Sequence, residues 1–299
     1  MGLLVVGTGA LACLFAARLA GSGEKVTMLG SWPEGLAALR QHGARLFEMD
    51  GSTHQYPVEV LDGTDFHREF AQVLVLVKSW QTERVARQLD ECLTPGGIAL
   101  TLQNGLGNYE TLVGALGKAR VALGVTTVGT RMLEPGYVQH TGEGKVSIGV
   151  HPNLDGLEEL LKKAGFQVEM IADPKSLLWG KLVINAAINP LTALLRVANG
   201  ELLSRPTARE LLRDAAREAA LVASCQGIKL PYADPVVAVE EVARNTASNT
   251  SSMLQDVLRG TPTEIDAING AIIKAGEQVG VPTPVNTMLW QLIKGLDKH

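Results

Sequence analysis

Short apolar runs alternate with amphipathic stretches along the first 170 residues. The run Leu3-Leu4-Val5-Val6 contains no polar residue, which is typical of a strand buried on both faces of a parallel sheet. Further strands are predicted at residues 25–29, 73–77, 98–102, 121–130, 145–149 and 167–171, with helices at residues 11–19 and 157–163 among them. Strands that alternate with helices predict an α/β layer structure.

The pattern changes after Asp173-Pro174. From residue 176 to the end, the chain is rich in Ala and Leu at helical spacing and contains no convincing strand. Turns are expected near Pro190, Gly200, Pro206, residues 227–231, Gly260 and Pro282. We therefore predict two domains, an α/β domain over residues 1–171 and an all-helical domain over residues 172–299.

A glycine-rich turn, Gly7-Thr8-Gly9-Ala10-Leu11-Ala12, follows the first strand and opens the first helix. This is the G-x-G-x-x-A form of the dinucleotide fingerprint. In that motif the first glycine allows a tight turn, the second lets a pyrophosphate approach the backbone, and the small Ala12 allows close packing of helix on strand. A plain glycine turn is the alternative. In this position the motif favours a Rossmann-type, doubly wound dinucleotide-binding domain, with phosphates at the helix start.

Cofactor choice depends on the end of the second strand, where the chain reads Gly30-Ser31-Trp32. An acid there would bind the ribose 2′-hydroxyl of NAD, and an Arg would receive the 2′-phosphate of NADP. Neither is present, and the missing acid favours NADP. Ser31 is either a hydrogen-bond donor to that phosphate or an ordinary turn residue. Lys78, at the end of the strand 73–77, is a candidate for a cofactor phosphate or a solvated strand-end lysine.

Three polar residues recur every fourth position in an otherwise apolar helix: Lys181, Asn185 and Asn189. Residues four apart share one helical face, and polar groups buried without partners are costly. The row therefore marks either a binding site or internal pairing and capping. Pro190 disfavours helical geometry at Asn189, so we expect a helix end or kink there.

Two later clusters are candidates for the same site. Residues 249–256 place hydroxyls and an amide at the start of an apolar run, which also suits helix capping. Thr261, Pro262 and Glu264 have the form of a capping box, so capping is the simpler reading of Glu264 from the residues alone. Asn104, before Gly105, follows the strand 98–102. It suits an ordinary turn and also places an amide where a nicotinamide or substrate would lie.

Composition narrows the function. The 299 residues are 46% hydrophobic and 19% charged with a net charge of -4, and they include no basic block, so we expect a globular protein without a nucleic-acid partner. Cys13, Cys92 and Cys225 have neither metal nor disulfide spacing, which predicts a reducing compartment and no metal site. No uncharged apolar run approaches the ~18 residues of a membrane span. We expect a cytoplasmic protein.

Taken together, these motifs resemble the ketopantoate reductase (2-dehydropantoate 2-reductase) family over essentially the whole chain. The resemblance is carried by the glycine loop, Lys78-x-Trp80-Gln81, Gln103-Asn104-Gly105, and the row from Lys181 to Ala193. It is completed by Asn249-x-x-Ser252-Met253-Leu254-Gln255-Asp256 and Thr263-Glu264-Ile265-Asp266-x-Ile268-Asn269-Gly270. The second-half motifs, in this order, are the more specific part.

The resemblance implies NADPH-dependent reduction of ketopantoate to (R)-pantoate in pantothenate and coenzyme A synthesis. It implies that Lys181 is the general acid and that Glu264 hydrogen-bonds the substrate hydroxyl. Substrate would be held by Asn104, Asn185, Asn189, Asn249 and Ser252, and the cofactor by Gly7 to Ala12, Ser31, Lys78 and Asn104. The family usually has an Arg after the second strand, and its replacement by Gly30-Ser31 keeps NADH use open.

Two alternative functions are consistent with the same residues. One is a β-hydroxyacid dehydrogenase acting on another short branched acid, which would share the glycine loop but lack the run from Ser251 to Asp256. The other is a dinucleotide-sensing protein without turnover, which would need no general acid. The helical half is apolar enough to bury itself or a partner subunit, so a homodimer is also open.

Overall fold

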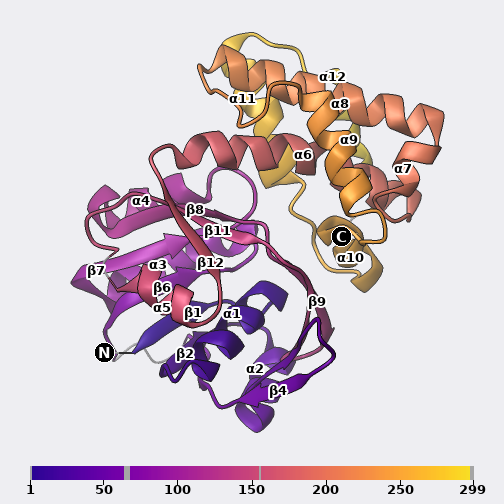
Figure 1. The fold of residues 1–299 in the computed structure, drawn as a ribbon. Helices are drawn as coiled ribbons and strands as arrows, with labels where there is room; N and C mark the ends of the chain where they lie inside the picture. The colour runs from indigo at the N-terminus through magenta and orange to yellow at the C-terminus, as the bar shows by residue number, and fades with distance from the viewer. Residues whose placement is uncertain (1, 64–67, 155, 297–299) are drawn as a thin grey trace. The chain divides into compact units, whose positions relative to one another are not determined.

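The computed structural model describes residues 2–63, 68–154 and 156–296. The chain forms two compact units (Figure 1). The α/β unit comprises Met1–Gln103 and Asn108–Pro174, and the helical unit comprises Asn104–Gly107 and Lys175–His299. The short segment Asn104–Gly107 thus belongs to the helical unit, although it lies between two elements of the α/β unit in sequence.

The main sheet of the α/β unit has the doubly wound order expected from the sequence. Its strands, in spatial order, are β12 (Gln167–Ile171), β11 (Lys145–Gly149), β8 (Val121–Thr126), β7 (Leu93–Thr101), β6 (Phe70–Val75), β1 (Leu3–Val6), β2 (Val26–Leu29) and β5 (Glu59–Leu61). Neighbouring strands are parallel except β8 and β11. The order reverses between β1 and β6, and ligands of such sheets bind at this switch point. The predicted fold class is confirmed.

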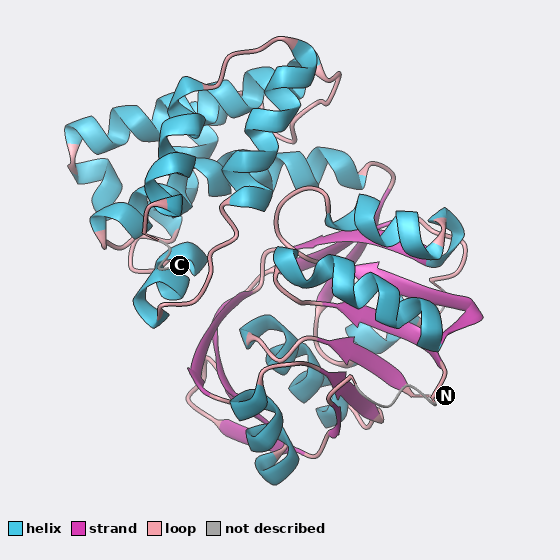
Figure 2. Ribbon diagram, turned by 180° about the vertical axis from the view of Figure 1, so that it is seen from behind, coloured by secondary structure: helices cyan, strands magenta, loops and turns pink. Residues whose placement is uncertain are grey.

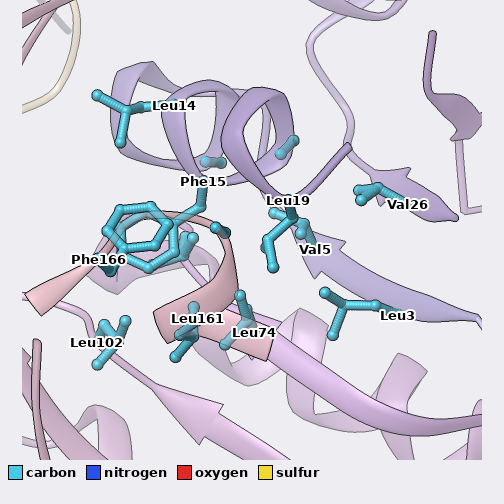
Figure 3. Packing of buried hydrophobic residues seen from close by; sticks show 14 of the residues in the cluster. Leu3, Val5, Leu14, Phe15, Leu19, Val26, Leu74, Leu102, Leu161 and Phe166 are labelled. Carbon is cyan, nitrogen blue, oxygen red and sulfur yellow. The ribbon is translucent and has the colours of Figure 1, made fainter. Parts of the chain in front are cut away.

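Helices cover both faces of this sheet. Side chains of β1 point alternately to the two faces, and all four are buried because each face is covered. Leu3 and Val5 pack in one cluster with α1 (Ala10–Gly21) and α5 (Leu157–Lys163). Phe15 of α1 stacks on Phe166 in this cluster, with 4.2 Å between ring centroids (Figure 3). The side chains of Leu4 and Val6 pack with α3 (Thr82–Cys92) and α4 (Asn108–Leu116). The short helices α2 (Pro33–His42), η1 (Ser79–Gln81) and η2 (Lys118–Arg120) complete the connections.

A smaller four-stranded sheet was not anticipated. Its order is β4 (Thr53–Tyr56), β3 (Ala44–Phe47), β10 (Tyr137–Gly142) and β9 (Gly129–Glu134). The run 121–130, expected to be one strand, is divided: β8 ends at Thr126 in the main sheet and β9 begins at Gly129 in the small one. Between them, Thr127 pairs with Lys145 through both its backbone and its hydroxyl, which ends β8 beside β11.

The strand predicted at 73–77 is also shifted. β6 spans Phe70–Val75, and Leu76 still donates to the Val6 carbonyl at 2.8 Å before the chain leaves the sheet. Lys78 therefore follows the sheet edge by two residues rather than standing on the strand itself.

The helical unit contains only helices and turns among its described residues (Figure 2). Its elements are α6 (Pro174–Leu195), α7 (Glu201–Ser204), α8 (Pro206–Cys225), α9 (Pro235–Asn245), α10 (Ser252–Arg259), the π-helical turn η3 (Asp266–Gly270), α11 (Ala271–Val279) and α12 (Pro284–Lys294). By length and composition α6 could cross a membrane. However, 72% of its most apolar window is buried inside the protein, as in the core helix of a soluble protein, so this is weak support for a membrane span.

Of the helix end or kink expected at Asn189, the helix end is wrong, because α6 continues through Pro190 to Leu195. A proline has no amide hydrogen, so it cannot donate to the carbonyl four residues earlier, that of Ala186. The side chain of Asn269 fills this role: its Nδ2 donates to the Ala186 carbonyl at 3.0 Å. The Asn269 side chain is fully buried, and its second Nδ2 hydrogen bond, also 3.0 Å, is to Asn286 Oδ1. A distant residue thus supplies the donor that the helix lacks.

Candidate active site

The side chains of Lys181 and Asn104 form a hydrogen bond within the helical unit. Lys181, on α6, donates from Nζ to Asn104 Oδ1 at 2.6 Å. The segment that carries Asn104 is fixed by its neighbours, since Leu106 N donates to the Ala267 carbonyl at 2.9 Å. Gly105 has φ +82°, and a Cβ there would lie 2.5 Å from the same carbonyl oxygen. Only glycine fits so close to the Ala267 carbonyl. The contact fixes the segment of Asn104 against Ala267, three residues after Glu264.

Glu264 acts on Lys181 electrostatically. The carboxyl residue is only 5% exposed, and its charge raises the pKa of Lys181. Burial of the Lys181 ammonium acts in the opposite direction and is the larger effect, so the pKa of Lys181 falls from 10.5 to about 8. Lys181 is therefore a stronger acid than an ordinary exposed lysine.

The predicted capping box is wrong. The Thr261 hydroxyl donates to the Asp256 carbonyl at the end of α10, at 3.2 Å, and its backbone N donates to the same oxygen at 3.0 Å. Thr261 thus closes the preceding helix instead of opening the next one. Glu264 precedes η3, where its own carbonyl accepts from Ala267 N and Ile268 N, each at 3.1 Å.

The remaining substrate candidates lie on two elements of the helical unit. Asn185 is partly buried and Asn189 is buried, on the same face of α6 as Lys181 by helical register. Ser252 is the exposed first residue of α10, and Asn249 lies just before it. The helix cap is the neighbouring Ser251, whose Oγ accepts from Leu254 N at 3.1 Å.

Ser251 also ties α10 to α6, which the sequence did not reveal. Its Oγ lies 2.7 Å from Thr192 Oγ1 in the core, and Thr192 in turn donates to the Ile188 and Asn189 carbonyls. The run of hydroxyls before α10 therefore serves two purposes: Ser251 caps and anchors the helix, and Ser252 presents its side chain at the surface.

The glycine loop of the α/β unit fits a dinucleotide. Gly7 has φ +128°, and a Cβ there would lie 2.9 Å from the Leu76 carbonyl and 3.2 Å from Ala12 Cβ, so the protein itself requires this glycine. A Cβ on Gly9 would meet no protein atom within 4 Å. Packing does not require a glycine at position 9, whereas a pyrophosphate approaching the backbone would. The first turn of α1 carries no acidic residue and no side-chain cap, which suits an anion there.

At the end of β2, the predicted Ser31 contacts a residue that sequence reasoning missed, Arg84 of α3. Ser31 Oγ accepts from Arg84 Nη2 at 2.8 Å and from Gln81 Nε2 at 3.5 Å. Arg84 lies on α3, in the same stretch of chain that begins with Lys78. The sequence does show Arg84 as a cation two residues after Thr82, shortly beyond the Lys78-x-Trp80-Gln81 motif. It does not show the hydrogen-bond partner of Arg84, because Ser31 lies 53 residues away in sequence. Within the described ranges, no group of three or more His, Cys, Asp or Glu side chains could hold a metal ion.

Known proteins are similar to this chain over nearly its whole length. The family described as ketopantoate reductase PanE/ApbA matches residues 3–153, and its C-terminal part matches residues 173–297. The 2-dehydropantoate 2-reductase of Archaeoglobus fulgidus is 40% identical over 228 residues, 75% of each chain. That of Halobacterium salinarum is 33% identical over 98% of each chain.

Solved structures agree. A PanE/ApbA family ketopantoate reductase from Ralstonia eutropha has a TM-score of 0.92 and 31% identity, covering 99% of this chain and 98% of that one. D-mandelate dehydrogenase, solved with NADH and anilino(oxo)acetate, has a TM-score of 0.91 over 99% and 98% of the two chains. At 24% identity, however, it shows the fold alone. The family model and the curated relatives support an oxidoreductase. The chain belongs to the ketopantoate reductase family.

Proposed function

We propose that the protein reduces 2-dehydropantoate (ketopantoate) to (R)-pantoate with NADPH, as a cytoplasmic step in the biosynthesis of pantothenate and coenzyme A. The single observation that carries the proposal is the grouping of Lys181, Asn104 and Glu264 in the helical unit of a chain from this family. A lysine held by an amide and shifted towards neutral pKa is suited to donate a proton to a carbonyl oxygen that gains charge.

Lys181, Asn104 and Glu264 have different roles in the proposed reduction. The nicotinamide, when bound, supplies the hydride that reduces the C2 ketone of the substrate. Lys181 donates the proton that neutralises the new alkoxide, and its pKa of about 8 keeps most molecules protonated at pH 7 while easing release of the proton. Asn104 orients the ammonium by accepting its hydrogen bond. Glu264 keeps the ammonium charged and accepts a hydrogen bond from a substrate hydroxyl.

Neutral groups bind the rest of the substrate. Asn185 and Asn189 on α6, with Asn249 and Ser252 beside α10, offer amide and hydroxyl donors to the carboxylate and hydroxyl of ketopantoate. Because none of these four side chains is charged, they add specificity without altering the balance between Lys181 and Glu264. The glycine loop, Ser31 and Lys78 bind the cofactor in the α/β unit.

The direct test is the initial rate of NADPH oxidation at 340 nm with ketopantoate and a panel of other 2-keto acids. Fast turnover confined to ketopantoate is the expected result. Turnover with a different keto acid alone would keep the chemistry and overturn the substrate. NADPH binding without turnover on any keto acid would favour a sensing protein.

The role of Lys181 is tested by Lys181→Ala, which should lower kcat at least ~10²-fold because a positioned acid is lost. Lys175→Ala is a matched control, since it removes the same charge near the exposed start of the same helix. Near-normal kcat in Lys181→Ala would remove this residue from the acid's role.

A further inference from the structure

The hydrogen bond between Arg84 and Ser31 leads to a prediction about cofactor selection that the family resemblance does not contain. At the end of the second strand of such domains, the side chain that faces the ribose decides between NAD and NADP. In this chain that position is a serine, and the guanidinium that reaches it comes from α3. We propose that Arg84 binds the 2′-phosphate and makes the protein selective for NADPH over NADH. This inference rests on the proposed function.

The geometry places a cation where a 2′-phosphate is expected. Arg84 Nη2 donates to Ser31 Oγ at 2.8 Å, so the planar guanidinium lies directly at the end of β2. Gln81 Nε2, 3.5 Å from the same oxygen, adds an amide donor on the same side. A guanidinium offers five donors in a fixed fork, and one hydrogen bond to Ser31 leaves others to bind phosphate oxygens.

The residues that end β2 carry no acid. Strand β2 ends without an acidic residue that would accept from a free ribose 2′-hydroxyl, since Gly30, Ser31 and Trp32 follow Leu29. The neighbouring acid on α3, Glu83, is ion-paired with Arg87 at 3.4 Å, one turn further along. Arg84 is therefore the guanidinium of this helix that reaches Ser31.

The arrangement also explains why a serine is accommodated at position 31. A long cationic side chain there would place its charge beside the Arg84 guanidinium, and like charges at close range repel. A serine instead accepts a hydrogen bond from Arg84 and can rotate its own hydroxyl towards a phosphate oxygen. The positive charge has been supplied from α3 instead of from the turn after β2.

Binding measurements test this without relying on turnover. Isothermal titration of the full-length protein with NADPH, NADH and 2′,5′-ADP gives three dissociation constants. We expect NADPH to bind more tightly than NADH. In Arg84→Ala the Kd of NADPH and of 2′,5′-ADP should rise at least ~10-fold, because charge-assisted bonds to the phosphate are lost. The Kd of NADH should change less than about 3-fold.

Two further variants make the test specific. Arg87→Ala removes the same charge from the same helix but from the side chain paired with Glu83, so it should leave the Kd of NADPH within about 2-fold. Arg84→Lys keeps the charge but not the fork and should fall between wild type and Arg84→Ala. Arg84 is exposed, so none of these variants should alter the melting temperature.

The outcomes separate this inference from the proposed function. If Arg84→Ala weakens NADPH and NADH equally, or leaves both unchanged, the assignment of Arg84 to the 2′-phosphate is overturned. Reduction of ketopantoate with either cofactor would still stand in that case. If the wild-type protein binds neither dinucleotide, the proposed function itself fails.

Discussion

The contact between Asn269 and the helix α6 gives a prediction that depends on the structure alone. Pro190 cannot donate the usual helical hydrogen bond to the Ala186 carbonyl, and Asn269 Nδ2 donates to that oxygen at 3.0 Å. The same amide donates to Asn286 Oδ1, and Asn286 Nδ2 in turn donates to Glu218 Oε2 at 2.8 Å. Substitution Asn269→Ala removes both donors from a fully buried position.

The cost follows from the groups left behind. The Ala186 carbonyl and Asn286 Oδ1 each lose a partner in the core, and an unsatisfied buried acceptor costs about 1–3 kcal/mol. Part is recovered, because Asn269 Oδ1 is itself buried without a hydrogen-bond partner among the described residues and is removed as well. We expect Asn269→Ala to lower the free energy of unfolding by about 2–4 kcal/mol.

A double-mutant cycle with Pro190→Ala tests the reasoning. Alanine at 190 restores an amide that can donate to Ala186, so Asn269→Ala should cost about 1–2 kcal/mol less in that background. Stability is measured by urea unfolding followed by tryptophan fluorescence, to which the buried Trp179 contributes. Asn199→Ala is the control: it removes a bond to Thr246 and should cost the same with or without Pro190. Equal costs of Asn269→Ala in both backgrounds would refute the link to the proline.

Two predictions concern titrating groups. Because Lys181 must be protonated to act as an acid, kcat/KM should fall about tenfold per pH unit above about 8. In Glu264→Gln this limb should move to lower pH, since the charge that raises the pKa of Lys181 is gone, and an unmoved limb would contradict that coupling. Hydrogen bonds from Arg209 and then Arg213 lower the pKa of Glu240 to about 2, so its stabilisation is present above pH 4.5 and is lost as pH falls towards 2. Calorimetry should show Glu240→Gln melting below wild type at pH 7, with the difference shrinking across that range; a pH-independent difference would contradict this.

Local patterns in the sequence determined the class of fold and the identity of the candidate residues. The all-apolar run of β1, the glycine turn and the helix that follows are contiguous, so their periodicity and backbone demands can be read without knowing any distant partner. The same holds for Lys181, Asn185 and Asn189, which share a face because a helix repeats every 3.6 residues. The motifs of the second half, in their order, indicated the family.

Tertiary structure decided what depends on partners far away in the chain. Pro190 predicts a helix end or kink on local grounds, yet Asn269, 83 residues after Ala186, donates to the Ala186 carbonyl and the helix continues. Asn104 lies in a turn by sequence, but the Ala267 carbonyl holds its segment in the helical unit beside Lys181.

The end of β2 in the α/β unit shows the same limit. Ser31 lacks any local sign of its partner, because Arg84 reaches it from another helix. Periodicity and turn chemistry report the preferences of neighbouring residues. Hydrogen bonds between residues tens of positions apart form only when the packed elements bring those residues together, and in this protein such bonds position the candidate residues Asn104 and Arg84.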